Sequence, residues 1–278
     1  MKEATSNTNL VLEVLIATMN RTSLSFIEKM FPHNKLENLS LLIINQTKLG
    51  HECVSNFENI RVINTYETGL SKSRNLAIKN AIGDICLIAD DDVEYVKDFD
   101  EIVKEAYHHF KHASIILFKI DTFTGEDYKT YPETSKRLLD RNNIKPTSSI
   151  EMTFKREAIV NNNMKFNTLF GLGSYFNAGE EYLFLKDALQ RGLIICFENQ
   201  TIVKHALERS TSDIGSDNYV KTISALNYLD FKSFSYLLLA KYLFYLLIHK
   251  VIGFKDIIKK FRVGVIAINN CKSLSKKL

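Results

Sequence analysis

The first 115 residues alternate short apolar runs with segments of helical pattern, and this alternation restricts the fold more than any other feature of the sequence. Apolar runs of strand length cover residues 10–17, 40–44, 60–64 and 85–89. Helical patterns cover residues 24–30, 71–81 and 98–110. This order predicts an α/β protein with a largely parallel sheet, in which a ligand binds at the carboxyl ends of the strands.

The second part of the chain adds strands and a further helix to this pattern. Strand-like runs cover residues 113–120, 149–154, 193–197 and 201–205. Glycines 171, 173 and 179 predict a flexible loop over residues 170–179, and a helix follows it over residues 180–191. Residues 121–149 are polar and show no clear period.

Composition and charge restrict the class of protein. With 278 residues, 45% of them hydrophobic, the chain can bury a full core, and one large domain with an appendage is expected. The formal net charge of +4 is too small to indicate a nucleic-acid partner. From Lys241 to the end there are nine Lys or Arg against one acid, so the tail is basic.

The cysteines and the N-terminus both favour a cytosolic protein. The four cysteines show no metal-binding spacing, so we expect reduced thiols: Cys53, Cys86, Cys196 and Cys271. The first ten residues are polar, and the apolar run behind them is short and contains Glu13, so no signal peptide is expected.

An acidic run stands where the fourth apolar run ends. Asp90, Asp91 and Asp92 directly follow Ile85–Ala89. In a strand, Asp90 and Asp92 point the same way and Asp91 points elsewhere, so two carboxylates lie a few Å apart. Such a pair suits Mg²⁺ or Mn²⁺ in an enzyme that handles a nucleotide diphosphate. The alternative is a solvated acidic turn that begins the next helix.

Two stretches carry a resemblance to a known family. These are GLSKSRNLAIKNAIGDICLIADDDV, residues 69–93, and FGLGSYFNAGEEYLFLKDALQRG, residues 170–192. In their order and separation they resemble the Arg-Asn, DxD and paired-acid motifs of family 2 glycosyltransferases with the GT-A fold, over about residues 10–210. The resemblance implies a Rossmann-like mixed, mostly parallel sheet with helices on both faces. We expect a catalytic domain over residues 1–215 and a helical tail over residues 216–278.

The resemblance also implies roles for the acidic residues. Asp92 is expected to bind the metal, Mn²⁺ or Mg²⁺, and Asp90 to bind the metal or the nucleotide ribose. His205 matches a position where the family sometimes has a further metal ligand, although a polar residue at a strand end is the common alternative. Glu181 is expected to be the base for direct displacement with inversion, with Glu180 near the acceptor. A structural role for both glutamates at a helix N-terminus stays open.

The nucleotide-binding residues are expected from the same resemblance. They are Thr18, Asn20, Gln46, Arg74, Asp90 and Asp91. The second apolar run ends in Asn45 and Gln46, where the family usually has acids that contact uridine. Because an amide oxygen still accepts a hydrogen bond from uracil, a UDP-sugar is the first expectation for the donor.

The tail is expected to lie on a membrane. Residues 234–248 are rich in Leu, Tyr and Phe, but Lys241 interrupts a run that is shorter than the roughly 20 residues of a membrane span. The basic residues behind it suit an anionic inner leaflet: Lys255, Lys259, Lys260 and Arg262. The alternative is a helix that completes the core or a dimer contact.

The sequence therefore predicts an inverting, metal-dependent glycosyltransferase of polysaccharide biosynthesis, such as capsule synthesis. We expect its acceptor to be a glycan or a lipid-linked saccharide. We expect the enzyme itself to lie on the cytoplasmic face of the cell membrane. A nucleotidyltransferase acting on a sugar phosphate would need a Gly-rich loop after the first strand, and TMNRTS contains no glycine. A non-catalytic nucleotide-sugar binding module would lack the base, whereas Glu180 and Glu181 are present. The sequence does not decide the sugar, the linkage or the oligomeric state.

Overall fold

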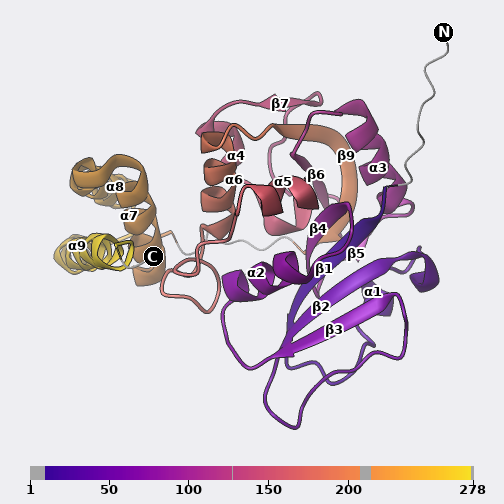
Figure 1. Cartoon of the computed structure of the whole chain (residues 1–278). Coiled ribbons are helices and arrows are strands. Elements are labelled where there is room, and N and C mark those ends of the chain that lie inside the picture. The colour runs from indigo at the N-terminus through magenta and orange to yellow at the C-terminus, as the bar shows by residue number, and fades with distance from the viewer. Residues whose placement is uncertain (1–9, 127, 207–213, 277–278) are drawn as a thin grey trace. The chain divides into compact units, whose positions relative to one another are not determined.

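The computed structural model describes residues 10–126, 128–206 and 214–276. It contains a mixed nine-stranded sheet with helices, followed by a helical C-terminal region (Figure 1). The predicted α/β class is confirmed. The N-terminal residues on which the prediction of no signal peptide rests lie almost entirely outside the described residues.

The strands of the sheet are β1 (Leu12–Met19), β2 (Ser40–Gln46), β3 (Ile60–Thr65), β4 (Ile85–Asp90), β5 (Glu94–Tyr95), β6 (Ile115–Thr122), β7 (Lys136–Leu138), β8 (Met152–Lys155) and β9 (Ile195–His205). Their order is β3-β2-β1-β4-β8-β6-β9-β5, and β7 pairs with β9. Strands β3, β2, β1 and β4 are parallel, so their carboxyl ends form one edge. Strand β8 lies antiparallel between β4 and β6.

The helices are α1 (Ile27–Met30), α2 (Leu70–Asn80), α3 (Phe99–His109), α4 (Arg141–Ile144), α5 (Arg156–Asn161), α6 (Glu180–Gln190), α7 (Asp217–Phe231), α8 (Ser235–Ile248) and α9 (Ile257–Leu274). Helices α1 and α3 pack on the face of β1 that carries Val14 and Ile16. Helix α2 packs on β1 and β2 from the other face. The prediction of helices on both faces is therefore confirmed.

Strand β1 also carries one buried charged residue, and neighbouring polar groups supply its hydrogen bonds. Glu13 is fully buried, and its carboxylate accepts hydrogen bonds from the guanidinium of Arg61 at 2.6 Å and from the backbone N–H groups of Ile82 and Gly83 at 2.7 and 3.0 Å. A Cβ added at Gly83 would lie 2.6 Å from the Glu13 Cβ, so only glycine fits there. Because this carboxylate is paired and hydrogen-bonded, its burial is compatible with the core.

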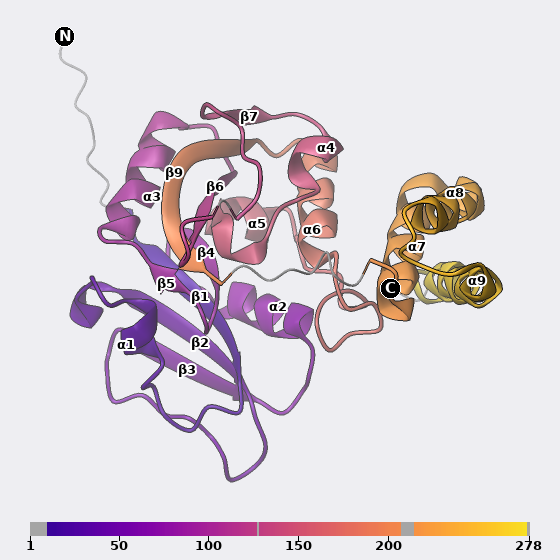
Figure 2. The same cartoon turned by 180° about the vertical axis from the view of Figure 1, so that it is seen from behind.

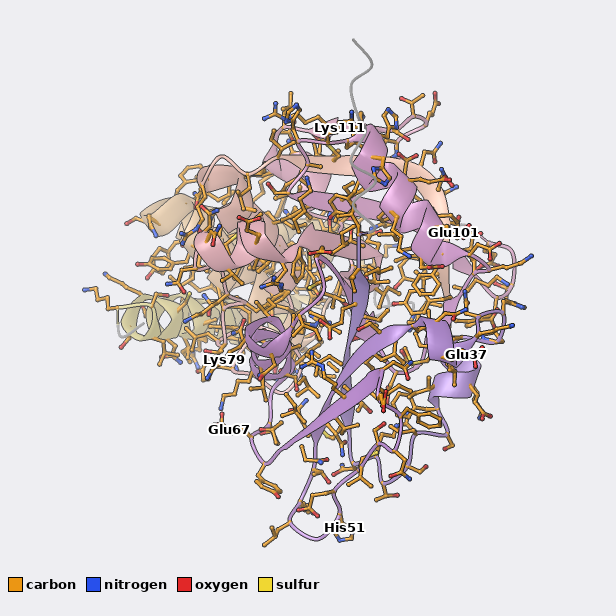
Figure 3. All side chains as sticks on the ribbon, turned by 45° about the vertical axis from the view of Figure 1, so that its right-hand side comes forward. Glu37, His51, Glu67, Lys79, Glu101 and Lys111 are labelled. Atoms are coloured by element: carbon orange, nitrogen blue, oxygen red, sulfur yellow. The ribbon has the colours of Figure 1, made fainter. Side chains whose placement is uncertain are left out.

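Some local predictions differ from the structure. The two strands expected over residues 193–197 and 201–205 are one strand, β9, whose pairing with β6 shifts register between Leu117 and Ile120. The helix expected over residues 24–30 has only the four residues of α1. The strand expected over residues 149–154 begins as a 3₁₀ turn, Ser149–Glu151, before β8. Figure 3 labels His51 in the loop after β2 and Glu67 in the loop after β3, and both polar loops project beyond the end of the sheet.

The chain divides into two compact units. The first comprises residues 1–168 and 180–207, and the second comprises residues 169–179 and 208–278. The loop directly before α6 thus groups with the C-terminal helices, whereas the sequence placed it with the catalytic residues. The functional division at residue 215 stays a prediction.

The second unit is a small bundle of α7, α8 and α9, which lie side by side (Figure 2). Its core contains Val220, Leu243 and Ile268, and Gly264 lets α9 approach Leu239 closely. The predicted helical tail is confirmed. Within the described residues, Asp217–Ile248 is one helical stretch that is long and apolar enough to cross a membrane by length and composition alone, and most of its apolar window is not buried.

Candidate functional site

The acidic run lies at the carboxyl edge of the sheet, as predicted. Strand β4 ends at Asp90, which lies opposite Ala17 of β1, and Asp91 and Asp92 belong to the turn that leads to β5. Because the strand ends at Asp90, side-chain alternation does not determine the direction of Asp92. The three carboxylates take three different sets of partners.

Asp90 belongs to a buried ion cluster centred on Arg74 of α2. The Arg74 guanidinium donates to Asp90 at 3.3 Å, to Glu180 at 3.1 Å and to Glu181 at 2.9 Å. Asp90 also accepts from the Ser149 hydroxyl at 3.3 Å. The Arg74 cluster, as we call these four charged residues, joins the first turns of α2 and α6 to the end of β4. One cation thus holds the end of β4 and the paired acids of α6, which are about 90 residues apart in the sequence.

The Arg74 cluster is strongly desolvated. The Arg74 side chain is 2% exposed, Glu180 5% and Glu181 16%. Burial disfavours the charge on Arg74, but the three carboxylates outweigh it and raise the arginine pKa, so Arg74 stays charged. Burial first, and the neighbouring Glu181 second, raise the pKa of Glu180 well above its usual range.

The two glutamates of α6 therefore differ. One carboxylate oxygen of Glu180, Oε2, is buried without a hydrogen-bond partner among the described residues. Such an oxygen is less costly when the carboxyl is protonated, in agreement with the raised pKa of Glu180. Glu181 is the more exposed of the pair, so it is the acid that a second molecule can reach.

Asp91 forms a second, more open contact with the loop after β1. Its carboxylate accepts hydrogen bonds from the Thr18 hydroxyl and from Arg21 Nε at 2.8 Å. The Arg21 guanidinium lies over the Phe26 ring, 5.0 Å from its centroid. Sequence reasoning missed Arg21, although its place in the polar loop after the first parallel strand was a usable signal.

Asp92 contacts His205 at the end of β9. The His205 Nε2 lies 3.4 Å from Asp92 Oδ1, and the Asp92 side chain is 62% exposed. The hydrogen bond from His205 lowers the pKa of Asp92. The structure brings these two predicted metal ligands together, while Asp90 is directed to Arg74. The described residues contain no group of three or more His, Cys, Asp or Glu that would hold a metal ion.

Asp92 and His205 nevertheless fit two neighbouring ligand positions around one metal ion. Two neighbouring ligand atoms on an octahedral ion with bonds of about 2.1 Å lie about 3 Å apart, close to the 3.4 Å between these two atoms. An imidazole together with a carboxylate favours a transition ion such as Mn²⁺ over Mg²⁺. The exposure of Asp92 leaves room for further ligands from water or a diphosphate.

The amides at the end of β2 have structural partners. Gln46 is buried, and its side-chain oxygen accepts from the backbone N–H of Gly69 at 2.7 Å, just before α2. Its backbone carbonyl accepts from the N–H of Asn20 at 2.8 Å. Asn45 donates to the carbonyl of Arg21 at 2.8 Å and so fixes the loop after β1. These residues shape the edge of the sheet instead of presenting free amide oxygens.

A cavity of about 480 Å³ lies beside the acidic turn. Arg21, Lys29, Asp91, Asp92 and Phe123 contribute to its lining. The predicted residues therefore form two groups: Thr18, Asp91, Asp92 and His205 beside this cavity, and Arg74, Asp90, Glu180 and Glu181 in the Arg74 cluster. The consecutive aspartates connect the two.

The sequence matches the family described as Glycosyl transferase family 2 over residues 18–175, more than half of the chain. The chain belongs to this family. It is a glycosyltransferase, as the motifs predicted. No curated protein matches it.

Solved structures of S. aureus TarS share the fold. The crystal structure of TarS residues 1–349 has a TM-score of 0.53 and 16% identity, and the match covers 84% of this chain and 71% of that one. The complex of TarS 1–349 with UDP-GlcNAc has a TM-score of 0.54 and 16% identity, covering 84% and 72%. The match covers 43% of the longer TarS chain, also at 16% identity and a TM-score of 0.53. The predicted family and GT-A fold are thus confirmed.

Proposed function

We propose that this glycosyltransferase moves a sugar from a nucleoside-diphosphate sugar to a hydroxyl group of a glycan or lipid-linked saccharide, with inversion and with the help of a divalent metal ion. The observation that carries the proposal is the Arg74 cluster. It brings the paired acids of α6 to the end of β4, so that a base and the aspartate turn belong to one site. A role in polysaccharide biosynthesis follows from such an acceptor.

The donor is proposed to bind in the cavity beside the acidic turn. Arg21 and Lys29 supply positive charge for a diphosphate, and Phe26 and Phe123 supply apolar surface for a base or sugar face. Solved TarS structures contain UDP and UDP-GlcNAc, which supports a uridine donor here. Thr18 is proposed to act by holding Asp91, and Asn20 by shaping the loop, because both have the structural partners described above.

Asp92 and His205 are proposed to hold the metal ion. Bound there, Mn²⁺ or Mg²⁺ supplies positive charge to the departing diphosphate. The protein contributes the position of this charge: His205 is the last residue of β9, and the Asp91 contact with Arg21 fixes the turn that carries Asp92. Asp90 is proposed to hold Arg74 and not the metal.

Glu181 is proposed to remove the proton from the acceptor hydroxyl. The Arg74 guanidinium donates to the Glu181 carboxylate at 2.9 Å and so holds in place the group that is to accept the proton. Glu180 keeps its proton near neutral pH because of its raised pKa, so it adds little negative charge beside Glu181. The two neighbouring acids therefore have different tasks.

The test compares Glu181→Gln with Glu180→Gln in sugar transfer and in donor binding. Loss of a general base lowers transfer about 100- to 10,000-fold, and donor binding, measured by the thermal shift with a UDP-sugar and Mn²⁺, stays unchanged. Glu180→Gln is expected to lose less. Equal, small losses in both variants would assign the pair to helix stability and remove the proposed base.

We also propose that the second unit binds to an anionic membrane from the cytoplasmic side. Its helices expose large apolar side chains that the bundle does not bury, including Phe234 (55% exposed), Phe244 (63%) and Phe254 (79%). Arg262 and Lys255 make no ion pair among the described residues. Lys259 and Lys260 instead share one carboxylate, that of Asp217, at 3.0 and 2.7 Å, so the four cations and this acid keep a net charge of +3.

Apolar insertion is therefore expected to dominate membrane binding. A net charge of +3 supplies about 3 kcal/mol, while burial of one exposed Phe supplies about 2 kcal/mol and burial of all three about 6 kcal/mol. Phe244→Ser with Phe254→Ser should release the protein from anionic vesicles even at low salt. The control Phe57→Ser removes a similarly exposed Phe (57%) from the first unit. If wild-type protein does not sediment with anionic vesicles at low salt, the membrane proposal fails.

A further inference from the structure

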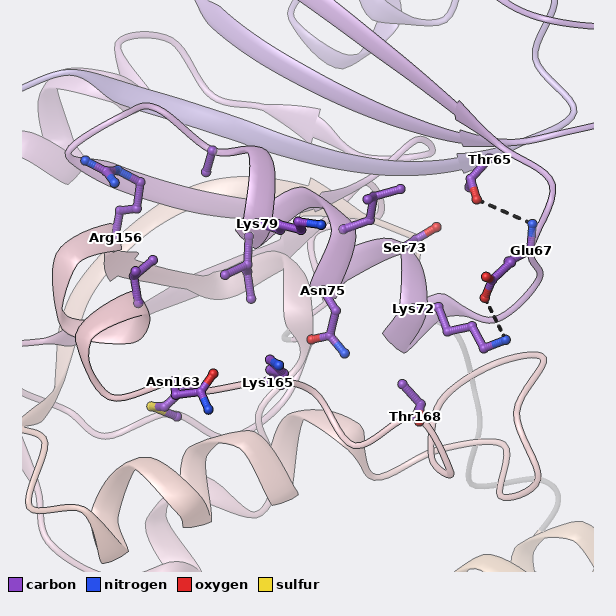
Figure 4. A pocket seen from close by; sticks show the side chains of 15 residues that line it. Thr65, Glu67, Lys72, Ser73, Asn75, Lys79, Arg156, Asn163, Lys165 and Thr168 are labelled. Carbon is purple, nitrogen blue, oxygen red and sulfur yellow. Dashed lines mark hydrogen bonds and ion pairs between the residues drawn. The ribbon is translucent and has the colours of Figure 1, made fainter. Parts of the chain in front are cut away.

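The first unit contains a second and larger cavity, of about 710 Å³, that none of the predicted site residues lines. Helix α2 forms one wall, and α5 with residues 163–168 forms the other (Figure 4). By their spacing, four lining residues of α2 share one face of the helix: Lys72, Asn75, Leu76 and Lys79. Arg74 belongs to the opposite, buried face. We call this space the α2 cavity.

The α2 cavity collects positive charge that the protein does not neutralise. Its cations are Lys72, Lys79, Arg156 and Lys165, against the single acid Glu67. Lys72 pairs with Glu67 at 2.9 Å. Arg156 donates through Nε to the carbonyl of Gly83. Within residues 10–126, 128–206 and 214–276, neither Lys79, Arg156 nor Lys165 takes part in an ion pair. Three uncompensated cations around one cavity attract an anion.

The remaining lining points to the chemical class of that molecule. Neutral hydrogen-bonding groups alternate with aliphatic ones: Thr65, Asn75, Asn163 and Thr168 beside Leu76, Val160 and Met164. Hydroxyl groups and CH faces are both present in a sugar ring, so this mixture suits a saccharide better than a bare ion. The volume lies in the usual range of small-molecule sites, about 300–1,000 Å³.

The wall opposite α2 is held in place by α2 itself. Asn75 donates to the carbonyl of Phe166 at 2.9 Å and accepts from the Phe166 N–H at 2.7 Å. The Phe166 ring stacks on Phe184 of α6 and lies 5.6 Å from the Arg74 guanidinium. The α2 cavity is thus preformed, and the same helix separates it from the Arg74 cluster.

We propose that the α2 cavity binds an anionic saccharide, a sugar that carries a phosphate or carboxylate group, as a remote unit of the acceptor. As an acceptor site this rests on the glycosyltransferase function proposed above. The donor cavity lies beside the acidic turn and shares no lining residue with it. Lys79, Lys165 and Arg156 hold the anion, and Asn163 binds hydroxyl groups.

The test measures binding to the full chain by calorimetry with glucose 6-phosphate, glucuronate, glucose and inorganic phosphate as probes. At least one of the two anionic sugars should bind at least about 10-fold more tightly than glucose and than inorganic phosphate. Lys79→Gln with Lys165→Gln should weaken that binding about 10-fold or more. Lys48→Gln with Lys136→Gln, two exposed lysines outside the cavity, should leave it unchanged.

The proposal is overturned if neither anionic sugar binds more tightly than glucose, if inorganic phosphate binds as tightly as they do, or if the cavity variants bind them like the wild type. Binding of UDP by the same variants shows that they are folded with an intact donor cavity. Failure of the glycosyltransferase proposal gives a different result, because wild-type protein would then bind the anionic sugar without transferring a sugar from any nucleotide donor.

Discussion

Replacement of Arg74 by methionine removes the cation of the Arg74 cluster while keeping much of its volume. The guanidinium faces carboxylates at 2.9, 3.1 and 3.3 Å in a place where it is only 2% exposed. At an effective dielectric constant of 20, each contact has a gross attraction of about 5 kcal/mol, most of which offsets desolvation. Removal of one partner of a buried ion pair typically costs about 3–5 kcal/mol. This is a large part of the stability of most proteins, about 5–15 kcal/mol.

The loss depends on pH in a direction that identifies its origin. Without Arg74, the folded state must hold the acids as unpaired charges, so it binds protons more tightly than the unfolded chain does. Stability of Arg74→Met should therefore fall relative to wild type as the pH rises from about 4 to 7. The assay is urea unfolding at pH 4.5, 6 and 7.5. Adding Glu180→Gln to Arg74→Met should recover part of the loss, because one buried acid is gone.

The matched control is Arg191→Met. Arg191, directly after α6, makes an exposed pair with Asp187 at 2.9 Å and donates to the carbonyl of Asn162 at 2.8 Å, so its removal should cost about 1 kcal/mol, with little change between these pH values. The reasoning is refuted if Arg74→Met loses no more stability at pH 7.5 than Arg191→Met. If Arg74→Met instead keeps its stability and loses affinity for UDP, Arg74 binds the nucleotide as the sequence suggested.

Three further variants test other parts of the structure. Because the pKa of Glu180 is raised in the folded state, this residue makes wild-type protein less stable as the pH rises from about 4.3 toward the raised pKa. Glu180→Gln should therefore gain stability relative to wild type between pH 5 and pH 8. An equal difference in unfolding free energy at both pH values would contradict this. Asp92→Asn should bind Mn²⁺ at least about 10-fold more weakly in calorimetry, with UDP binding in the absence of metal unchanged; unchanged Mn²⁺ affinity would exclude Asp92 as a ligand. Gly264→Ala places a Cβ 2.4 Å from Leu239 Cδ2 and should cost about 1–3 kcal/mol in urea unfolding; Gly253→Ala, where the nearest atom is 3.3 Å away, should cost less.

Much of the fold could be predicted because its signals are local. Strands β1, β2 and β4 are buried on both faces, so they read as continuous apolar runs bounded by polar loops. The observed ends of all four parallel strands lie within two residues of the predicted ones. Helix α6 was found because acids begin it and Gly192, with a φ of +77°, follows it. Strands β5 and β7 were missed because runs of two and three residues have no period to detect.

The partners within the site could not be predicted, because they depend on contacts between distant residues. Arg74 and Glu180 are separated by 106 positions, and nothing near Arg74 in the sequence shows that it contacts acids instead of a nucleotide. Alternation along β4 was extended to Asp92, although the strand ends at Asp90. The residue types of the site were thus visible in the sequence, while the division of the aspartates between Arg74, Arg21 and His205 required the fold.

The loop before α6 connects the two compact units through the chain, and this suggests a test of how Glu180 and Glu181 are positioned. Residues 169–179 group with the C-terminal helices: Lys221 lies 3.7 Å from the centre of the Tyr175 ring, and Asn270 donates to the Tyr175 hydroxyl at 2.6 Å. Gly179, with a φ of +98°, leaves no room for a Cβ, which would lie 2.8 Å from Leu226 Cδ1. Gly179→Ala should therefore strain the loop directly before Glu180 and Glu181 by about 1–2 kcal/mol. Transfer to the acceptor should fall while hydrolysis of the donor persists, because the donor cavity contains no residue of this loop.

Gly192→Ala is the control, since Gly192 has a similar φ of +77° at the other end of α6 and no atom within 4 Å of the added Cβ. Equal losses of transfer in both variants would mean that backbone strain anywhere around α6 is sufficient, and the loop would then have no specific role in positioning Glu180 and Glu181.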